Sequence, residues 1–185
     1  MEHNIRLPLT KEKAAAIKSG DTVYLTGELF TARDAAHKRL IELVGQGKEL
    51  PFQLEGAIIY YVGPTPAKPG YVIGSAGPTT SSRMDAYTPQ LLGLGLRGMI
   101  GKGKRRDDVV SAIKDTGAIY FGAIGGAGAL LASCIKSCEV IAFPDLGPEA
   151  IHRLYVESFP VVALIDATGE SLYESGRRAY LESDS

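Results

Sequence analysis

Segments patterned like β-strands alternate along this chain with segments patterned like α-helices, and this order limits the folds that it can adopt. Residues 21–31 alternate apolar and polar side chains, as a half-buried strand does. Residues 32–44 then place Ala36, Leu40 and Val44 on one helical stripe. Further strands are predicted at residues 57–62, 71–73, 99–100, 118–121, 140–143, 154–156 and 161–165. Further helices are predicted at residues 10–19, 84–92 and 106–115, and a last one follows the glycine-rich turn 122–128 and continues through Ser137. This alternation predicts an α/β fold.

The composition indicates one soluble domain without affinity for nucleic acids or membranes. The chain has 185 residues, of which 45% are hydrophobic, which suffices for one core but not for two large domains. We expect a single domain over residues 1–173 and a polar C-terminal tail over residues 174–185. A net charge of -1 does not suit a nucleic-acid-binding protein. No apolar run approaches the roughly 18 residues that span a bilayer, and residues 1–9 lack the apolar core of a signal peptide, so we expect a cytoplasmic protein.

The two cysteines of the chain are too few to hold a metal centre by themselves. Cys134 and Cys138 are four residues apart and would share one face of the predicted helix. Structural zinc sites use about four ligands and cysteine-bound iron–sulfur clusters about three or four. With no histidine nearby, the pair is interpreted as small buried side chains in a reducing compartment. Any metal chemistry would then need a metal held by another chain.

The segment Thr31–Arg39 follows a predicted strand and opens a predicted helix. A helix N-terminus offers free N–H groups and partial positive charge, and Arg33 at this end could grip a carboxylate through two hydrogen bonds. The alternative is that Arg33 pairs with a surface acid such as Asp34. His37 lies one turn further on, where a packed or solvated histidine is the more common outcome, and it is kept as a candidate.

The segment Gly74–Asp85 joins a predicted strand to a predicted helix with glycines, hydroxyls and one arginine. One of the four successive hydroxyls at residues 79–82 could cap the helix, but a cap uses only one of them. The surplus hydroxyls, followed directly by Arg83, favour a loop that binds an oxyanion.

Two further glycine-rich segments follow predicted strands. In the first, Gly101 and Gly103 flank Lys102 and allow a ligand to approach the backbone, and the basic run at 104–106 is interpreted as a solvated face. The second, Gly122–Gly128, has the strand, turn and helix order that can hold an anion with backbone N–H groups. It matches neither the dinucleotide-binding nor the Walker pattern.

From the residues alone, the loops indicate a protein that binds a small polycarboxylate or phosphate. Arg33, Arg83 and Lys102 lie on separate loops beside small residues, and no Ser-His-Asp arrangement is visible.

The same segments strongly resemble the beta subunit of class I fumarases and L-tartrate dehydratases. The resemblance extends from about Leu7 to Tyr173 and is carried by these stretches: Thr31–Arg39, Gly77–Asp85, Ile100–Gly103, Gly122–Ala127, Glu149–Ile151 and Val156–Pro160.

The resemblance implies a swivelling β/β/α domain with a mixed sheet and flanking helices. It implies a lyase of the hydro-lyase type, a fumarate hydratase of the tricarboxylic acid cycle or a tartrate dehydratase, that moves water on a small dicarboxylate. It further implies a [4Fe-4S] cluster on a partner alpha subunit, not on this chain, in a hetero-oligomer with two copies of each subunit.

By the same resemblance, each site residue acquires a role. Arg33, Arg83 and Lys102 would bind the substrate carboxylates, and Thr79 would be the base that moves the proton on carbon. Thr80 and the glycines at 125–126 (Gly125 and Gly126) would help to position the substrate. The segment departs from the family pattern at residues 81–82, near which the family often has a second Gly or Ala, whereas this chain has two more polar serines.

Three functions remain open at this point. The leading hypothesis is a hydro-lyase subunit, with fumarate/malate as the first substrate pair and tartrate as the second. The others are a non-catalytic anion-binding or assembly subunit and a phosphate-binding regulatory domain that needs no partner.

Overall fold

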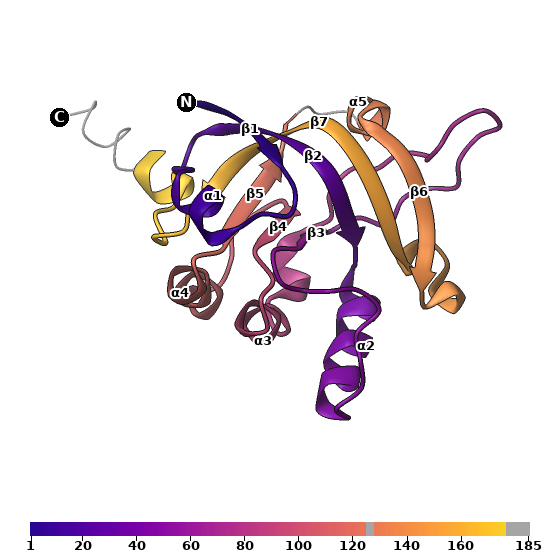
Figure 1. The fold of residues 1–185 in the computed structure, drawn as a ribbon, viewed down its shortest axis with the longest axis horizontal. Helices are drawn as coiled ribbons and strands as arrows, with labels where there is room; N and C mark the ends of the chain where they lie inside the picture. Colours follow the sequence, from indigo (N-terminus) through magenta and orange to yellow (C-terminus); the bar gives the residue numbers. More distant parts are fainter. Residues whose placement is uncertain (125–127, 177–185) are drawn as a thin grey trace.

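The strands of this protein form one mixed sheet in the computed structural model, which describes residues 1–124 and 128–176 (Figure 1). Over this part of the chain the strand order is β1-β2-β3-β4-β5-β7-β6, with a further pairing between β2 and β7. The strands are β1 (Glu2–Arg6), β2 (Thr22–Thr31), β3 (Ile58–Tyr60), β4 (Gly98–Gly101), β5 (Ile119–Ala123), β6 (Ile135–Ala142) and β7 (Ile151–Ile165).

The helices are short, and the two longest lie on one side of the sheet (Figure 1). The α-helices are α1 (Lys11–Ala15), α2 (Asp34–Gly45), α3 (Thr88–Gly93), α4 (Asp107–Thr116) and α5 (Gly128–Ser133), and the 3-10 helices are η1 (Ser81–Met84) and η2 (Pro144–Glu149). Figure 1 shows α2, α3 and α4 together below the sheet, whereas α5 lies at its opposite end. No helix in the described residues is long and apolar enough to cross a membrane.

The antiparallel pairing of β2 with β7 closes part of the sheet into a barrel. It extends from the pair Thr22 and Val162 to the pair Phe30 and Arg153, so strands β2-β3-β4-β5-β7 form a closed ring. The other edge of β2 pairs with β1 in its first half and with β3 at its end. The register shifts next to Gly27, whose φ of 133° and close approach to Leu7 favour glycine.

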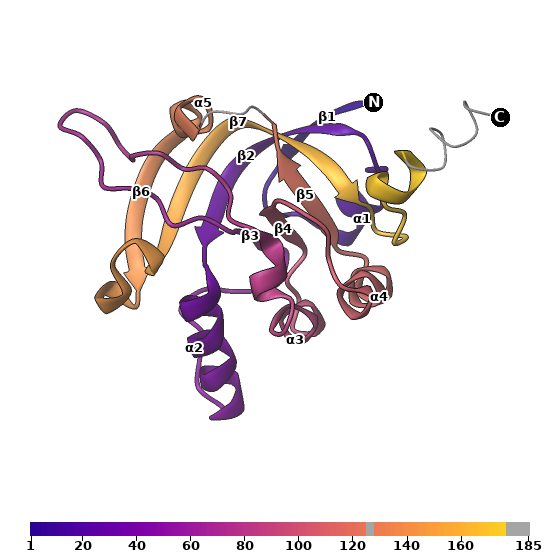
Figure 2. The same ribbon diagram turned by 180° about the vertical axis from the view of Figure 1, so that it is seen from behind.

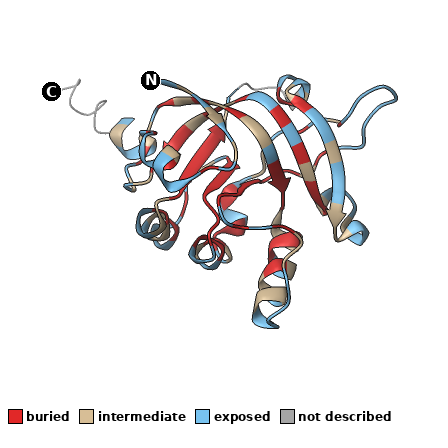
Figure 3. Ribbon diagram, in the orientation of Figure 1, coloured by how far each residue is buried: buried red, intermediate tan, exposed pale blue. Residues whose placement is uncertain are grey.

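The strands β3, β4 and β5 have apolar residues on both faces because each face packs against its own core. Ile58 and Tyr60 point into the barrel, whereas Ile59 and Tyr61 point toward the helices. The helices complete the second core through residues spaced four apart, such as Ala36 and Leu40 on α2 or Val109 and Ile113 on α4. Figure 3 shows the resulting unbroken burial along the central strands.

Four neighbouring strands run parallel and therefore end at the same edge of the sheet. β2, β3, β4 and β5 pair in parallel, with Thr31 beside Tyr60, Tyr60 beside Ile100 and Gly101 beside Gly122. Loops that leave the carboxyl ends of such strands are where α/β folds commonly bind ligands.

The expected α/β class, with a mixed sheet and flanking helices, is confirmed, and the five-stranded barrel is compatible with the β/β/α description. Several element predictions were wrong. Residues 71–73 form no strand and lie in a loop, where Tyr71 and Val72 are exposed and Ile73 is buried. The two short strands predicted at 154–156 and 161–165 are parts of one strand, β7, and β1 was not expected at all.

The prediction that Cys134 and Cys138 share a helix face was also wrong. Helix α5 ends at Ser133, and Cys138 lies on β6, where it pairs with Leu154 of β7. This segment pairs with β7 as the outermost strand of the sheet, and that pairing overrides the helical periodicity. Both thiols are free and partly buried.

Candidate active site

The carboxyl ends of the parallel strands bring three of the predicted site segments to one edge of the sheet. Arg33 lies two residues beyond the end of β2, and Lys102 directly follows β4. Tyr61 directly follows β3, and its carbonyl accepts a 2.7 Å hydrogen bond from the backbone N–H of Thr79. In Figure 2, the start of α2, the segment η1 and the end of β4 lie on the same side. The candidates Gly125 and Gly126 lie outside the described residues.

Arg33 lies at the N-terminus of α2 beside two acidic side chains. Its Nε is 3.5 Å from an oxygen of Glu149 and 3.9 Å from an oxygen of Asp34, and neither contact is a hydrogen bond. The structure thus holds ion pairs of Arg33 with Asp34, the alternative raised from the sequence, and with Glu149, and both are longer than a hydrogen bond. Gly63 makes room for the arginine, because a Cβ there would lie 3.1 Å from Cδ of Arg33.

The loop that carries the hydroxyls extends the sheet edge beside the end of β4. Thr80 forms a parallel bridge with Lys102, and the N–H of Ser81 donates to the carbonyl of Lys102 at 2.9 Å. Thr80 precedes η1 but makes no side-chain capping bond, which removes the simplest structural explanation for its hydroxyl. Thr79 is half-buried, whereas Thr80 and Lys102 are exposed.

Arg83 and Lys102 carry positive charges that have no partner among the described residues. Arg83 is exposed on η1. Over residues 1–124 and 128–176, neither side chain has a hydrogen bond or an ion pair. Two unpaired cations on adjoining loops suit a small anion bearing more than one carboxylate.

Ser81 has a structural role, so one of the two serines at the departure from the family pattern is explained. Its hydroxyl is buried and lies 2.9 Å from the hydroxyl of Tyr120, which donates to the carbonyl of Gly103 at 2.8 Å. A Cβ on Gly101 would overlap the Ser81 hydroxyl. The serine thus ties the hydroxyl loop to the loop of Lys102.

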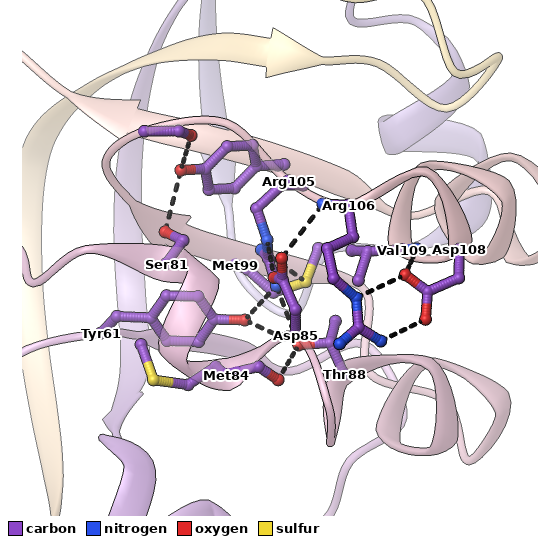
Figure 4. Close-up of polar contacts among 12 residues, drawn as sticks. Tyr61, Ser81, Met84, Asp85, Thr88, Met99, Arg105, Arg106, Asp108 and Val109 are labelled. Carbon is purple, nitrogen blue, oxygen red and sulfur yellow. Dashed lines mark hydrogen bonds and ion pairs between the residues drawn. The ribbon is translucent and has the colours of Figure 1, made fainter.

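A buried ion pair between Asp85 and Arg105 joins the same two loops more firmly (Figure 4). Both side chains are fully buried, and Nε of Arg105 donates to Asp85 at 2.6 Å. Asp85 also accepts from the backbone N–H of Arg106 at 3.0 Å, and Arg105 donates to Thr88 at 2.8 Å and to Tyr61 at 3.3 Å. Burial alone would lower the pKa of Arg105, but Tyr61 and Asp85 raise it above its usual value.

Sequence reasoning missed this ion pair. Arg105 was assigned to a solvated basic face, and that assignment was wrong, because its guanidinium packs over the rings of Tyr61 and Tyr120 at 5.3 and 4.8 Å. The available signal was Asp85, an acid at the end of the segment that resembles the family. The sequence around residues 104–106 does not indicate that the side chain of Arg105, rather than that of Arg106, is buried.

His37 is a packed residue that stays neutral at ordinary pH. It is fully buried, and burial lowers its pKa to about 4. Its Nδ1 lies 2.8 Å from the carbonyl of Arg33, so this nitrogen carries the proton and donates it to that carbonyl. Nε2 has no partner in the described residues, and the ring packs edge-on to Tyr61 at 5.4 Å. His37 therefore holds the Arg33 backbone rather than facing solvent.

The residues of this chain do not fit an iron–sulfur cluster. The whole sequence has two cysteines, and the described residues contain no group of three or more His, Cys, Asp or Glu side chains that could hold a metal. Two thiols are fewer than a [4Fe-4S] cluster needs.

Burial of neutral His37 makes the stability of the fold depend on pH. The unfolded chain takes up a proton at this residue below about pH 6.5, whereas the folded chain does so only near pH 4. The free energy of unfolding should therefore fall by about 3 kcal/mol between pH 7 and pH 4 on account of His37. His37→Asn keeps a donor for Arg33 but does not titrate, and urea titrations should show a flatter pH dependence. An equally steep profile would contradict the assignment.

Loss of the buried charge on Asp85 should destabilise the protein strongly. Asp85→Asn leaves Arg105 charged and buried without its counter-ion, which should cost about 3–5 kcal/mol in the free energy of unfolding. The matched control is Asp108→Asn, which breaks the exposed pair with Arg106 and should cost less than about 1 kcal/mol. Urea denaturation measures both. Equal losses in the two variants would show that Asp85 does not anchor the loops.

Comparison with known proteins identifies the family. The family model described as Fumarase C-terminus matches residues 1–176. A Methanocaldococcus jannaschii protein provisionally named L(+)-tartrate dehydratase subunit beta is 38% identical over 180 residues, covering 94% of this chain and 92% of that protein. The anaerobic class I fumarate hydratase of Escherichia coli is 43% identical over 152 residues, covering 81% of this chain and 28% of the enzyme. Fumarate hydratase 2 of Leishmania major is 37% identical over 174 residues, covering 92% of this chain and 31% of that enzyme. This chain spans less than a third of the length of the two fumarate hydratases. It belongs to the fumarase C-terminus family, whose named relatives are hydro-lyases.

Proposed function

We propose that this chain is the beta subunit of a hydro-lyase that reversibly adds water to a small dicarboxylate, with fumarate and malate as the pair. The observation that carries the proposal is the edge where β2, β3 and β4 end. There the loops that carry Arg33, Lys102 and Thr79 adjoin. Arg83 and Lys102 have no ion pair in the described residues, and the two ion pairs of Arg33 are longer than hydrogen bonds. A dianion of a few carbon atoms would supply the missing negative charge at both of its ends.

In this proposal, Arg33, Arg83 and Lys102 hold the two carboxylates. Charge-assisted hydrogen bonds from arginine to carboxylate are short and directional, so they orient the substrate as well as bind it. The buried bonds of Ser81 and Asp85 set the distance between the two loops. Preset cations act without the reorganisation that water would need, which favours a charged transition state.

Thr79 is the proposed base for the proton on carbon. A threonine hydroxyl is a weak base at its ordinary pKa, and it needs nearby positive charge to favour the alkoxide. Arg83 is four residues further along the same loop, and Lys102 pairs with the next residue, Thr80. This arrangement supports Thr79 as the residue whose Oγ1 takes and returns the proton.

The iron–sulfur chemistry is proposed to belong to a partner alpha subunit. The two cysteines of this chain cannot hold a [4Fe-4S] cluster, and the M. jannaschii relative is named a beta subunit. The E. coli enzyme is a longer chain, of which this domain covers 28%. We propose that the cluster-bearing part is supplied here by a separate chain, that the enzyme is active only in that complex, and that it holds two copies of each subunit in the cytoplasm.

L-tartrate is the second candidate substrate. The M. jannaschii protein, which matches this chain over nearly its full length, is named a tartrate dehydratase subunit. Tartrate carries one more hydroxyl than malate, so the two substrates make the same demands on the three cations. The experiment is co-expression with an alpha-type subunit under anaerobic conditions and measurement of turnover of malate, fumarate, tartrate and mesaconate. Turnover of none of them would refute the hydro-lyase proposal.

Removal of the charge on Arg83 should abolish turnover without unfolding the chain. Arg83→Ala removes an exposed side chain that has no hydrogen bond or ion pair in the described residues, so the melting temperature should stay unchanged. The reconstituted enzyme should lose at least about 100-fold in kcat/KM, because a carboxylate then lies in the site without its counter-charge. Arg153→Ala, which removes another exposed arginine on β7, is the control and should keep full activity. Near-normal turnover in the Arg83 variant would remove this residue from the site.

Replacement of Thr79 should slow the proton transfer more than it weakens binding. In Thr79→Ala, kcat should fall by about 100-fold or more while KM changes little, as for the loss of a general base. Thr79→Ser keeps a hydroxyl at the same place and should recover most of the rate. If kcat is unchanged in Thr79→Ala, or if serine does not restore it, the residue is not the base.

A further inference from the structure

The loop between β3 and η1 (residues 63–78, the projecting loop) extends from the candidate site to beyond β6, as both ribbon views show (Figures 1 and 2). Its two ends are parts of the site. Gly63 contacts Arg33 at the start of the loop, and Thr79, directly after its end, is bonded to the carbonyl of Tyr61 at 2.7 Å. A molecule that covers the site therefore lies against the two ends of this loop.

The base of the projecting loop is braced, so the loop has a defined shape. The N–H of Thr65 donates to the carbonyl of Ser75 at 3.1 Å, and the N–H of Ser75 donates to the hydroxyl of Thr65 at 2.7 Å. Ile73 and Ala76 are buried in the barrel core, and the hydroxyl of Tyr60 donates to the carbonyl of Ala76. Preorganised loops of this kind lose little conformational entropy when they bind a partner.

The tip of the loop presents apolar side chains that this chain does not cover. Tyr71 is 70% exposed and Val72 is 48% exposed. They line a groove of about 690 Å³, whose other wall is formed by α5 and the start of β6. Large apolar side chains grouped on a surface mark an interaction site, and tyrosine is enriched at the centres of protein interfaces.

The rim of the groove is basic. Lys68 and Lys136 line it and are exposed, and their ammonium groups have no ion-pair partner in the described part of the chain. An apolar centre with a charged rim is the usual composition of a protein interface. The complementary surface has an apolar projection flanked by carboxylates.

We propose that the projecting loop and its groove are the docking surface for the cluster-bearing alpha subunit. The inference rests on the proposed function and names where the partner binds. That partner must approach the edge that holds Arg33 and Thr79 to complete the site, and the loop begins and ends at that edge. In the E. coli relative, the segment matched by this chain is 28% of the enzyme, so a much larger body accompanies this domain there.

The test is the affinity of the full chain for the co-expressed alpha subunit, measured with the double variant Tyr71→Ser/Val72→Ser. Loss of two interface anchors should raise the dissociation constant at least about 30-fold. The melting temperature of the variant alone should equal that of the unmodified chain, because both side chains are exposed. At saturating alpha subunit, kcat should return to its unmodified value, since the loop tip is not part of the chemistry.

The matched control is Leu94→Ser. Leu94 is 46% exposed and lies four residues before β4 begins, at the edge of the sheet opposite to the site. Loss of exposed apolar surface there should leave the affinity unchanged. Equal affinities of the double variant and the unmodified chain, or equal losses in the double variant and Leu94→Ser, would overturn the proposal.

Two further outcomes separate this inference from the proposed function. If the alpha subunit binds through the loop but the complex turns over no dicarboxylate, the docking surface stands and the hydro-lyase assignment fails. If the isolated chain is a dimer that the double variant dissociates, and the affinity for the alpha subunit is unchanged, the loop binds a second copy and the proposal is wrong.

Discussion

The pairing of β2 with β7 is the constraint on which the arrangement of the site depends. These two long strands close the ring β2-β3-β4-β5-β7, and closure fixes the four parallel strands side by side. Their carboxyl ends then share one edge, with neighbouring strands about 4.8 Å apart. Arg33 and Lys102 follow strands on either side of β3, so their backbones are separated by roughly two strand spacings, or about 10 Å. This distance is within reach of two long side chains that grip the ends of one small diacid.

Within this frame, the pair of Asp85 and Arg105 determines how the loops lie. A buried ion pair contributes little net stability, because the desolvation of both charges offsets most of their attraction. It strongly disfavours alternative loop conformations, however, since any of them would leave a charge buried alone. The pair and the bond between Ser81 and Tyr120 couple the loop that carries Thr79 to the end of β4. Such buried polar contacts favour one geometry, which is what the positioning of a reactant requires.

The sequence predicted the central strands and the turns at their ends, because apolar runs and glycine-rich turns are local signals. It did not predict the partners of Arg105, since burial of that arginine depends on Tyr61 and Tyr120, which are distant in sequence and adjacent only after the strands pair. The helix predicted through Ser137 failed for the same reason, because the strand partner of this segment, β7, lies beyond it. The positions of Arg33 and Lys102 followed from strand ends alone. Local patterns thus indicate where loops leave the sheet but not which of their side chains turn inward.

A partner that covers the edge of the sheet where Arg83 and Lys102 lie would connect substrate binding to assembly. Positive charges in water are screened, and their attraction for a carboxylate is weak at the high dielectric constant of the solvent. A protein surface placed over Arg83 and Lys102 would exclude water and strengthen the same contacts several-fold. Binding through Tyr71, at the tip of a loop that returns to Thr79, would link this exclusion directly to assembly. A chain alone would then hold the substrate weakly, and the complete site would form only in the complex.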